Sequence, residues 1–382
     1  MASPTFANLP TTIFTVMSAL AVKHGAINLG QGFPDEDGPI AIREAAARAL
    51  REESNQYPPM RGRPDLRRAL ARHAERFYGL AYDPETDVVV TSGATEALTA
   101  AILAFAQPGR EIVVIDPAYD SYRPIAEAAG AKVRTIGLTG PQWRLTEQAL
   151  QAAVTPATAA IVLNSPMNPL GRVFDADELA AVVRVLSSSN AVVICDEVYE
   201  HVVFDGGTHV PLATLPDMHD RTVRIGSAGK MFSLTGWKVG WAMGPAALVE
   251  TIAKAHQFLT FTTPPALQQA VAYALDQEID FTLRLTGTLE RRRDLLAGRL
   301  ARLGFRPLPS QGTYFLAADI CGLTAESDRE FCLRLVRDAG VALIPLSVFM
   351  RAAKPDNLVR FAFCKRREIL EEALNRLERF FS

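Results

Sequence analysis

The most conspicuous candidate for covalent chemistry in this sequence is a lysine among small and apolar neighbours. Lys230 follows a β-branched run that ends in the small residues 227–229, and Met231 and Phe232 come directly after it. Small residues allow a bulky ligand to approach the backbone closely. Burial among apolar side chains lowers the pKa of a lysine from about 10.4 and favours the neutral amine, which forms Schiff bases with carbonyl compounds. A lysine taken alone is more often an exposed loop residue, so the other motifs must decide between the two interpretations.

Two other motifs suit pyridoxal phosphate, the aldehyde most commonly expected opposite such a lysine. Asp196 follows five apolar residues, and a carboxylate at that depth needs a cationic or hydrogen-bonding partner, such as a protonated ring nitrogen. The glycine turn at 91–98 opens an alanine-rich helix, whose first amide groups form an anion site suited to phosphate. Both motifs also have structural alternatives, because Asp196 could cap the following turn and Ser92 could cap the helix.

One arginine and two tyrosines are further candidates for ligand binding. Arg360 interrupts an apolar strand, and a buried guanidinium without a carboxylate nearby in the sequence suggests a carboxylate ligand. Tyr119 follows the buried strand at 111–115. Because ligands bind at the carboxyl ends of strands in open α/β sheets, its ring is placed to stack on a planar group. Tyr57 lies in a proline-rich, irregular segment and is either a structural aromatic or a hydroxyl donor.

The elements that must position these residues alternate along the chain. Strand and helix patterns take turns from residue 87 onward, which predicts an α/β fold. The strands are predicted at 88–90, 111–115, 132–138, 159–163, 191–195 and 222–225. Helices are predicted at 40–52, from 64, from the turn at 91–98 to about 108, at 246–258 and at 281–303. Strands at 312–316, 341–344 and 358–363 and a last helix at 366–381 predict a second, small α+β domain.

Composition limits the class of protein. The chain has 382 residues, 48% of them apolar, which suits two domains better than one compact core. A net charge of −2 indicates no nucleic-acid partner. The four cysteines form no CxxC pair, which predicts reduced thiols of a cytoplasmic protein and no metal site. We expect no signal peptide from residues 1–4 and no membrane partner, since no apolar run reaches about 18 residues.

Gly30 and Gly32 form no dinucleotide-binding loop, because a third glycine is missing and Pro34 follows.

Four motifs, in order along the chain, resemble those of class I, fold-type I pyridoxal-phosphate aminotransferases. They are Asn-Leu-Gly-Gln-Gly-Phe-Pro at 28–34, the turn at 164–171, Asp-Glu-Val-Tyr at 196–199, and Ser-Ala-Gly-Lys at 227–230 followed by Gly-Trp-Lys-Val-Gly at 236–240. The resemblance covers nearly the whole chain and is greatest to the branch of methionine, kynurenine and glutamine aminotransferases. It implies a large cofactor-binding domain (40–285) with a mostly parallel seven-stranded sheet, and a small α+β domain (1–39 and 286–382). It also implies a homodimer with its active sites at the interface.

The resemblance further implies a role for each matching residue. Lys230 matches the Schiff-base lysine, and Asp196 matches the partner of the ring nitrogen. Asn168 and Tyr199 match the pair that hydrogen-bonds the phenolic oxygen of the ring, and Tyr119 matches the residue that stacks on the ring. The remaining cofactor-binding positions, mostly those of the phosphate cradle, are Gly93, Ala94, Thr95, Ser227, Lys238 and, from a second subunit, Tyr57.

Other matching residues are implied in substrate binding. Arg360 matches the residue that holds the substrate α-carboxylate, beside Asn168 and the Gly32 backbone. Phe261 matches an aromatic residue that reaches across the dimer. The aromatic residues that could line an apolar side-chain pocket are Phe14, Phe33, Tyr57, Tyr122 and Phe261.

The expected reaction is ping-pong transfer of an amino group to a 2-oxo acid. The expected donor is a neutral, sulfur-containing or aromatic L-amino acid of the methionine, glutamine or kynurenine type, because no second arginine motif singles out dicarboxylates. Three alternatives stay open: a cysteine-S-conjugate β-lyase, an N-succinyldiaminopimelate-type biosynthetic aminotransferase, and a non-catalytic effector-binding domain. The short stretch before the first motif disfavours the last of these, since such regulators carry an attached DNA-binding module.

Overall fold

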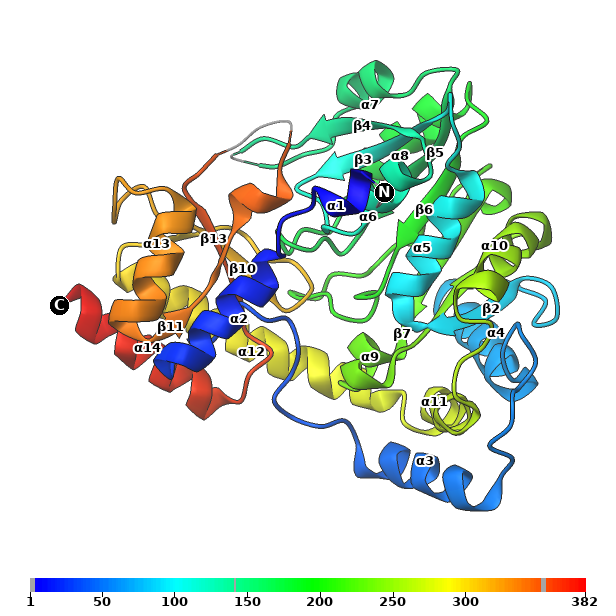
Figure 1. The fold of residues 1–382 in the computed structure, drawn as a ribbon, viewed down its shortest axis with the longest axis horizontal. Coiled ribbons are helices and arrows are strands. Elements are labelled where there is room, and N and C mark those ends of the chain that lie inside the picture. The colour runs from blue at the N-terminus through cyan, green and yellow to red at the C-terminus, as the bar shows by residue number, and fades with distance from the viewer. Residues whose placement is uncertain (1–3, 141, 352–354) are drawn as a thin grey trace.

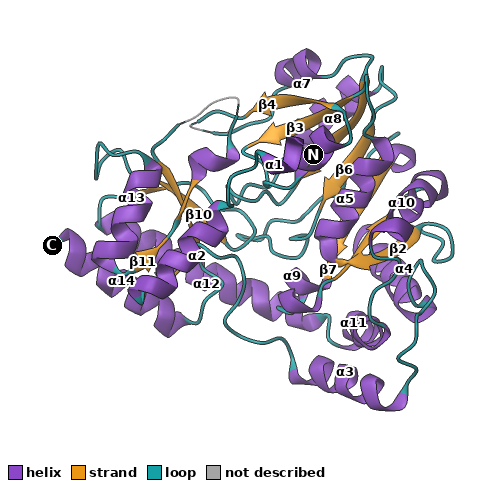
Figure 2. Cartoon of the chain, viewed as in Figure 1, coloured by secondary structure: helices purple, strands orange, loops and turns teal. Residues whose placement is uncertain are grey.

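The described residues form a seven-stranded sheet, a four-stranded sheet, a two-stranded pairing and the helices around them (Figure 1). The computed structural model describes residues 4–140, 142–351 and 355–382. Residues 1–3, on which the interpretation of the signal peptide partly rested, lie outside the described residues. The larger sheet lies among helices, and the smaller sheet lies beside it with the C-terminal helices (Figure 2).

The larger sheet has seven strands in the order β2-β8-β7-β6-β5-β3-β4. All its pairings are parallel except those of β8, which is antiparallel to both β2 and β7. The mostly parallel seven-stranded sheet of the predicted fold class is therefore confirmed. The strands are β2 (Val88–Ser92), β3 (Glu111–Asp116), β4 (Lys132–Gly137), β5 (Thr158–Asn164), β6 (Val192–Asp196), β7 (Thr222–Ser227) and β8 (Val239–Met243).

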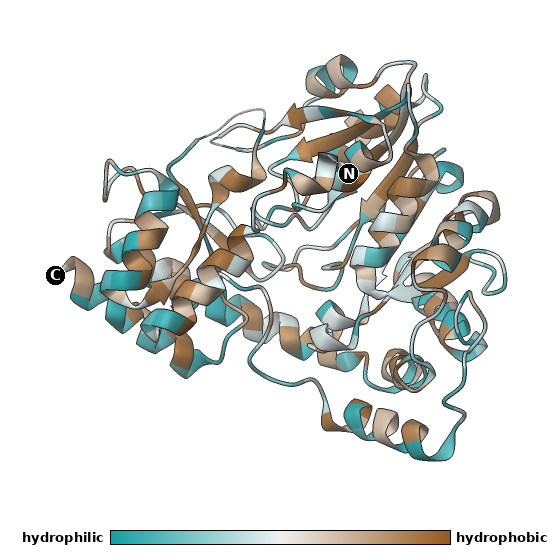
Figure 3. Ribbon diagram, viewed as in Figure 1, coloured by the Kyte–Doolittle hydropathy of each residue, from teal (hydrophilic) through white to brown (hydrophobic). Residues whose placement is uncertain are grey.

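Apolar strands form this sheet because helices cover both of its faces. Alternate residues of β3 enter different cores: Val113 packs in a cluster with Val182 of α8 (Ala176–Leu186), whereas Val114 packs in another with Ala97 of α5 (Gly93–Phe105). Continuous apolar runs are typical of such doubly covered strands. Figure 3 shows the central strands as the most hydrophobic part of the ribbon. The strand β4 lies at the edge of the sheet and is accordingly more polar and partly exposed.

The helices around the large sheet include several that the sequence patterns predicted closely and others that they did not. Among the latter are α6, α7, α8 and α9, although Asp175 and Glu178 form a capping box that signals the start of α8. These helices are α3 (Ile40–Glu52), α4 (Pro64–Tyr78), α5 (Gly93–Phe105), α6 (Tyr122–Ala128), α7 (Glu147–Ala153), α8 (Ala176–Leu186), α9 (Ala228–Met231), α10 (Ala246–Leu259) and α11 (Pro265–Gln277).

The second unit joins the two ends of the chain. Its antiparallel sheet has the order β12-β13-β10-β9, and β1 near the N-terminus pairs with β11 near the C-terminus. This pairing supports our proposal that residues 1–39 and 286–382 form one domain, with α12 running across the boundary. The elements are α1 (Pro4–Ala7), α2 (Ile13–His24), β1 (Ile27–Asn28), α12 (Asp280–Arg302), β9 (Arg306–Pro307), β10 (Phe315–Asp319), α13 (Asp328–Arg334), β11 (Val341–Ala342), β12 (Ile344–Pro345), β13 (Leu358–Ala362) and α14 (Arg367–Phe381).

The sheet topology brings chemically useful residues to one edge. β5, β6 and β7 are parallel neighbours that end at Asn164, Asp196 and Ser227, and Asn164 is paired with Asp196 in register. Parallel strands end at the same edge of a sheet, which is where open α/β sheets bind ligands. Among the described residues, no helix is both long and apolar enough to cross a membrane.

Gly240 of β8 lies against the start of α5, and its substitution tests how tightly the two are packed. A Cβ at this position would come within 2.5 Å of the backbone nitrogen of Ala94. We expect Gly240→Ala to lower the free energy of unfolding by about 1–3 kcal/mol, because backbone atoms must shift to make room. Denaturant unfolding measures this loss. Gly236→Ala is the matched control, since a Cβ there meets nothing within 4 Å; an equal loss in both variants would contradict the close approach.

Candidate active site

A cavity of about 350 Å³ lies at the carboxyl edge of the large sheet, with Arg360 and Phe315 of the small sheet in its wall. Most of the residues that the sequence predicted for the site meet there. These are Phe14, Gly32, Gly93, Ala94, Thr95, Tyr119, Asn168, Asp196, Tyr199, Ser227, Lys230, Lys238 and Arg360. The structure thus brings together residues that lie up to 346 positions apart, as between Phe14 and Arg360.

Lys230 stands on α9, one short turn beyond the end of β7. Its Nζ donates a hydrogen bond to the Tyr314 hydroxyl over 2.8 Å and lies 3.4 Å from the carbonyl oxygen of Gly32. Burial lowers the pKa of the Lys230 amine to about 8. The direction is the one that the sequence predicted, and it leaves a useful fraction of the amine neutral near physiological pH.

Asp196 is buried at the end of β6 and has hydrogen-bond donors on both carboxylate oxygens. The Tyr122 hydroxyl donates to Oδ2 over 2.5 Å, and the Val198 N–H donates to Oδ1 over 3.4 Å. Burial raises the pKa of Asp196 to about 6. The sequence placed Tyr122 in a substrate pocket, and this was wrong: its side chain is buried and is not part of the cavity wall. Its ring lies behind Asp196 because α6 begins at Tyr122 and packs that side chain into the core.

The start of α5 and two neighbouring polar residues form one corner of the cavity. Gly93 begins the helix with a φ of 74°, and a Cβ there would lie 3.2 Å from Lys238 Nζ. The Ser92 side chain makes no capping hydrogen bond, so the capping alternative does not describe this helix. A helix start, a hydroxyl from Ser227 and an ammonium from Lys238 are donors suited to a phosphate. The residues present therefore fit the phosphate group of the expected cofactor.

Arg360 of β13 is buried and has neutral partners. Its Nη1 donates to the Asn168 side-chain oxygen and its Nη2 to the Gly30 carbonyl, both over 2.8 Å. Among the described residues, its Nε has no partner. The guanidinium lies 3.9 Å from the centre of the Phe315 ring, and burial lowers the pKa of Arg360 to about 10. A buried cation with neutral partners favours an anionic ligand.

Besides Tyr122, three predicted residues lie outside the cavity of this chain. Tyr57 is 82% exposed and packs edge-on against Phe261, with ring centres 5.5 Å apart. Phe33 is half-exposed, and its ring lies 4.4 Å from Lys365 Nζ. The structure of one chain does not bring these three side chains to the other site residues.

A buried ion-pair cluster behind Asp196 and Tyr199 was not predicted. Arg224 of β7 donates to Glu197 over 2.6 Å and to Glu200 over 3.0 Å, and all three side chains are buried. The cluster ties β7 to the turn 196–200. The sequence feature that could have indicated this cluster is the order of polar residues at 196–200. Asp196 and Tyr199 face the cavity, whereas Glu197 and Glu200 face Arg224.

Two histidines extend this cluster towards α4. Potential ligand atoms of His73, Glu200 and His201 all lie within 4.8 Å of one another, as in a metal site. The Nε2 atoms of the two histidines are 2.7 Å apart, which is a hydrogen-bond distance, and Glu200 already accepts from Arg224. The geometry therefore favours a hydrogen-bonded network that supports the turn 196–200.

Comparison with known proteins identifies relatives along nearly the whole chain. The family model "Aminotransferase class I and II" matches residues 24–377. A probable N-succinyldiaminopimelate aminotransferase of Mycobacterium tuberculosis is 48% identical, over 96% of this chain and 95% of the relative. The methionine aminotransferase of Escherichia coli is 41% identical, over 97% and 96%. The human kynurenine–oxoglutarate transaminase 1 is 34% identical, over 94% of each.

Solved structures give the same result. The N-succinyldiaminopimelate aminotransferase of Mycobacterium tuberculosis superposes with a TM-score of 0.97, at 48% identity and over 100% of both chains. An Escherichia coli protein with methionine aminotransferase function superposes with a TM-score of 0.96, at 40% identity and over 99% of both chains.

The raised pKa of Asp196 predicts a stability change that depends on pH. Below its unfolded-state pKa near 4, Asp196 is protonated in both the folded and the unfolded state and does not change the free energy of unfolding. As pH rises to about 6 and above, the folded state must bury the charged carboxylate, so the free energy of unfolding falls. We expect cofactor-free Asp196→Asn to be about 1–3 kcal/mol more stable than the wild type near pH 8 and equal to it near pH 4. Urea unfolding at both pH values measures the difference. A variant that is less stable near pH 8 would contradict the burial cost.

Proposed function

The chain belongs to the class I and II aminotransferases, which are fold-type I enzymes dependent on pyridoxal phosphate, and within this family we propose that it acts on neutral amino acids. The proposed reaction moves the amino group of a neutral, sulfur-containing or aromatic L-amino acid to a 2-oxo acid. One observation carries this choice. Of the three cations in the cavity wall, Lys230 and Lys238 lie at the cofactor side, which leaves Arg360 for a single substrate carboxylate.

The aromatic walls next to Arg360 support the same choice. Its guanidinium lies 5.3 Å from the ring centre of Phe14 and 3.9 Å from that of Phe315, and both rings line the cavity. Apolar walls favour an apolar side chain over a second carboxylate, which would be buried there without a cation. Asn168 accepts from Arg360 and so fixes the guanidinium that would bind the α-carboxylate.

Protons are moved or held by two residues in the proposed mechanism. Bound pyridoxal phosphate supplies an electron sink for the pair left on the substrate Cα. The neutral amine of Lys230 would take the proton from that Cα as general base and then donate it, as general acid, to the cofactor carbon that takes over the amino group, which its pKa of about 8 permits. Asp196, with a pKa of about 6, is charged at neutral pH and can keep a proton on the ring nitrogen. The Tyr122 hydroxyl orients that carboxylate.

A second copy of the chain is part of the proposal. Tyr57 and Phe261 pack against each other and are both exposed, and Phe258, three residues before Phe261 in the chain, is 85% exposed. Apolar side chains gathered in this way are typical of an interface. We place Tyr57 and Phe261 at the active site of a partner subunit in a homodimer. The four free cysteines support a reducing compartment, the cytoplasm.

A second candidate substrate is an N-succinylated diamino acid. The observation in its favour is the 48% identity with the Mycobacterium tuberculosis relative, against 41% with the methionine aminotransferase. Its extra carboxylates would need cations that the described cavity wall of one chain does not offer beyond Arg360 and the two lysines.

A panel of donors tests the proposed substrate class. Methionine, glutamine, kynurenine, phenylalanine, aspartate and N-succinyl-L,L-diaminopimelate are each assayed with 2-oxoglutarate and pyruvate. We expect kcat/KM for the best neutral donor to exceed that for aspartate by at least about tenfold, because one buried carboxylate would lack a partner. The Lys230→Ala variant gives the background. A succinylated donor that outperforms every neutral one would replace the proposal with the second candidate.

Arg360→Lys tests the assigned α-carboxylate site. The lysine keeps the charge but loses the planar fork that binds a carboxylate through two parallel hydrogen bonds. We expect kcat/KM to fall about 10- to 100-fold for every amino acid, as a charge-assisted hydrogen bond is worth about 1.5–3 kcal/mol. Arg299→Lys, on the outer helix α12 and paired with Glu378, is the matched control and should leave kcat/KM unchanged. Equal values for both variants would rule out the role of Arg360.

A further inference from the structure

Tyr314 has no role in the assignments above, although its hydroxyl touches the reactive amine. Lys230 Nζ donates to this hydroxyl over 2.8 Å, and the hydroxyl in turn donates to the carbonyl of Gly32 over 2.5 Å. The Tyr314 side chain is 3% exposed and lies outside the cavity wall, so it reaches the amine from behind. Three atoms thus form a chain that ends on a backbone oxygen.

We propose that Tyr314 is a positioning residue for amino transfer: its hydroxyl holds the free amine of Lys230 so that the amine lone pair points into the cavity. The inference rests on the proposed function, which makes Lys230 the group that moves the Cα proton. It adds a residue to the proton-transfer step and changes nothing about the substrate.

The geometry of a neutral amine explains how the hydroxyl would act. The nitrogen of Lys230 carries one carbon, two hydrogens and one lone pair in tetrahedral directions. Two acceptors lie on one side of it, the Tyr314 hydroxyl at 2.8 Å and the Gly32 carbonyl at 3.4 Å. When the two N–H bonds point to these acceptors, the remaining direction belongs to the lone pair. Holding a reacting atom in one orientation is a recognised source of rate acceleration.

Tyr314 is itself held by a rigid loop. The N–H groups of Gln311 and Gly312 both donate to the Gly171 carbonyl, over 2.7 and 2.9 Å, and Thr313 N–H donates to the Val202 carbonyl over 2.9 Å. These bonds join the loop that precedes β10 to the backbone at Gly171 and Val202. The Tyr314 ring also packs edge-on against Tyr199, with ring centres 5.0 Å apart.

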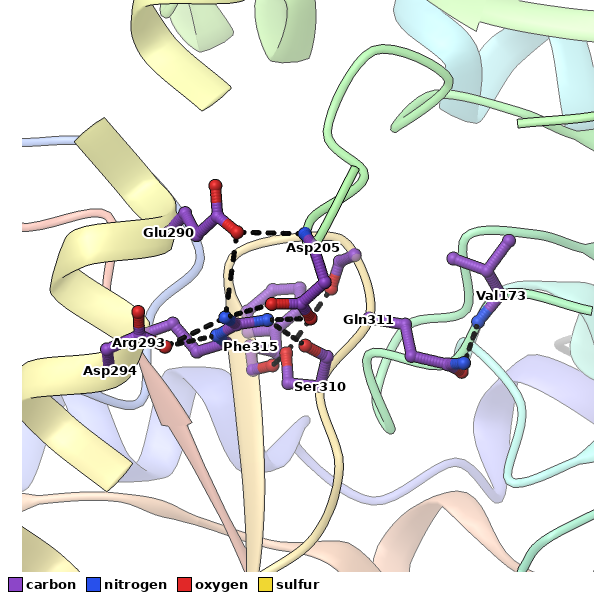
Figure 4. Close-up of polar contacts among 9 residues, drawn as sticks. Val173, Asp205, Glu290, Arg293, Asp294, Ser310, Gln311 and Phe315 are labelled. Atoms are coloured by element: carbon purple, nitrogen blue, oxygen red, sulfur yellow. Dashed lines mark hydrogen bonds and ion pairs between the residues drawn. The ribbon is translucent and has the colours of Figure 1, made fainter. Parts of the chain in front are cut away.

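An arginine also holds the start of this loop, at Ser310. Figure 4 shows Arg293 of α12 between Asp205 and Ser310. Its Nη1 lies 2.6 Å from Asp205 and donates to the Ser310 carbonyl over 2.9 Å, while the Ser310 hydroxyl donates to the Phe315 carbonyl. Because both ends of the loop are fixed, the Tyr314 hydroxyl has a defined position before any ligand arrives. This is the preorganisation that a positioning residue needs.

The electrostatic surroundings of Lys230 predict how its titration would respond. The hydroxyl stabilises the ammonium form by accepting a hydrogen bond, so its loss should lower the pKa of Lys230 below its present value of about 8. Burial keeps the Tyr314 phenol protonated, since it raises the pKa of that group well above 10. The other charged or titratable groups facing the amine are Asp196 and Cys364, which raise its pKa, Arg360 and Lys238, which lower it, and the neighbouring Tyr199.

Tyr314→Phe tests the proposal by removing one oxygen atom. We expect kcat on the high-pH plateau to fall about tenfold for every donor, which corresponds to the loss of one hydrogen bond. KM should stay within about twofold, and the acid limb of the kcat profile should move to lower pH. Tyr273→Phe is the matched control, because Tyr273 is a half-buried tyrosine of α11 that is not part of the cavity wall. Thermal unfolding of both variants confirms that they fold.

A second measurement uses the protein without cofactor or donor. Lys230 is labelled with trinitrobenzenesulfonate across a range of pH, and the labelled peptide is quantified by mass spectrometry. The midpoint of labelling should lie at lower pH in Tyr314→Phe than in the wild type and Tyr273→Phe. An unchanged midpoint together with an unchanged kcat plateau would overturn the proposal. Failure of the wild type to use any donor would contradict the proposed function, whereas the labelling midpoint tests Tyr314 independently of it.

Discussion

The site depends on keeping ionisable side chains buried without opposite charges in contact with them. Lys230 and Asp196 are hydrogen-bonded by tyrosine hydroxyls, and Arg360 by an amide and a carbonyl oxygen. Burial of a charge in this way raises the free energy of the folded state, and all three pKa values shift towards the neutral form. Ligand groups that bring a ring nitrogen, a phosphate and a carboxylate reduce that cost. The same physical cause therefore gives the amine its reactivity and the cavity its affinity.

Stability for such a site must come from elsewhere in the fold. The seven-stranded sheet supplies it through strands that are apolar on both faces and covered by helices. A properly paired cluster, Arg224 with Glu197 and Glu200, lies directly behind the unpaired groups and fixes the turn from which Asp196 and Tyr199 project. The rigid loop before β10 does the same for Tyr314 from the side of the four-stranded sheet. Unpaired charges face the cavity, whereas paired charges hold the walls.

The sequence patterns located most elements well because their signals are local. Helices such as α3, with its 3.6-residue apolar period, and strands such as β3, with a continuous apolar run, were predicted within a few residues of their observed bounds. β8 was not predicted, because its five residues contain Gly240 and follow a glycine-rich stretch, and its strand character comes from pairing on both sides with β2 and β7. Tyr122 was misplaced because a sequence does not show which way a helix turns its first residue.

The sequence by itself determined the chemistry: a lysine among small residues, a carboxylate at a strand end, a glycine-led helix start and an arginine in an apolar strand. These follow from residue type and the nearest neighbours along the chain, and motif order was enough to imply the family. Only the tertiary structure decided which groups touch. The contact of Tyr314 with Lys230 spans 84 residues, and that of Arg224 with the glutamates joins β7 to the turn that follows the adjacent parallel strand β6. Contacts of this kind depend on strand order and loop position, and neither is encoded in a local pattern.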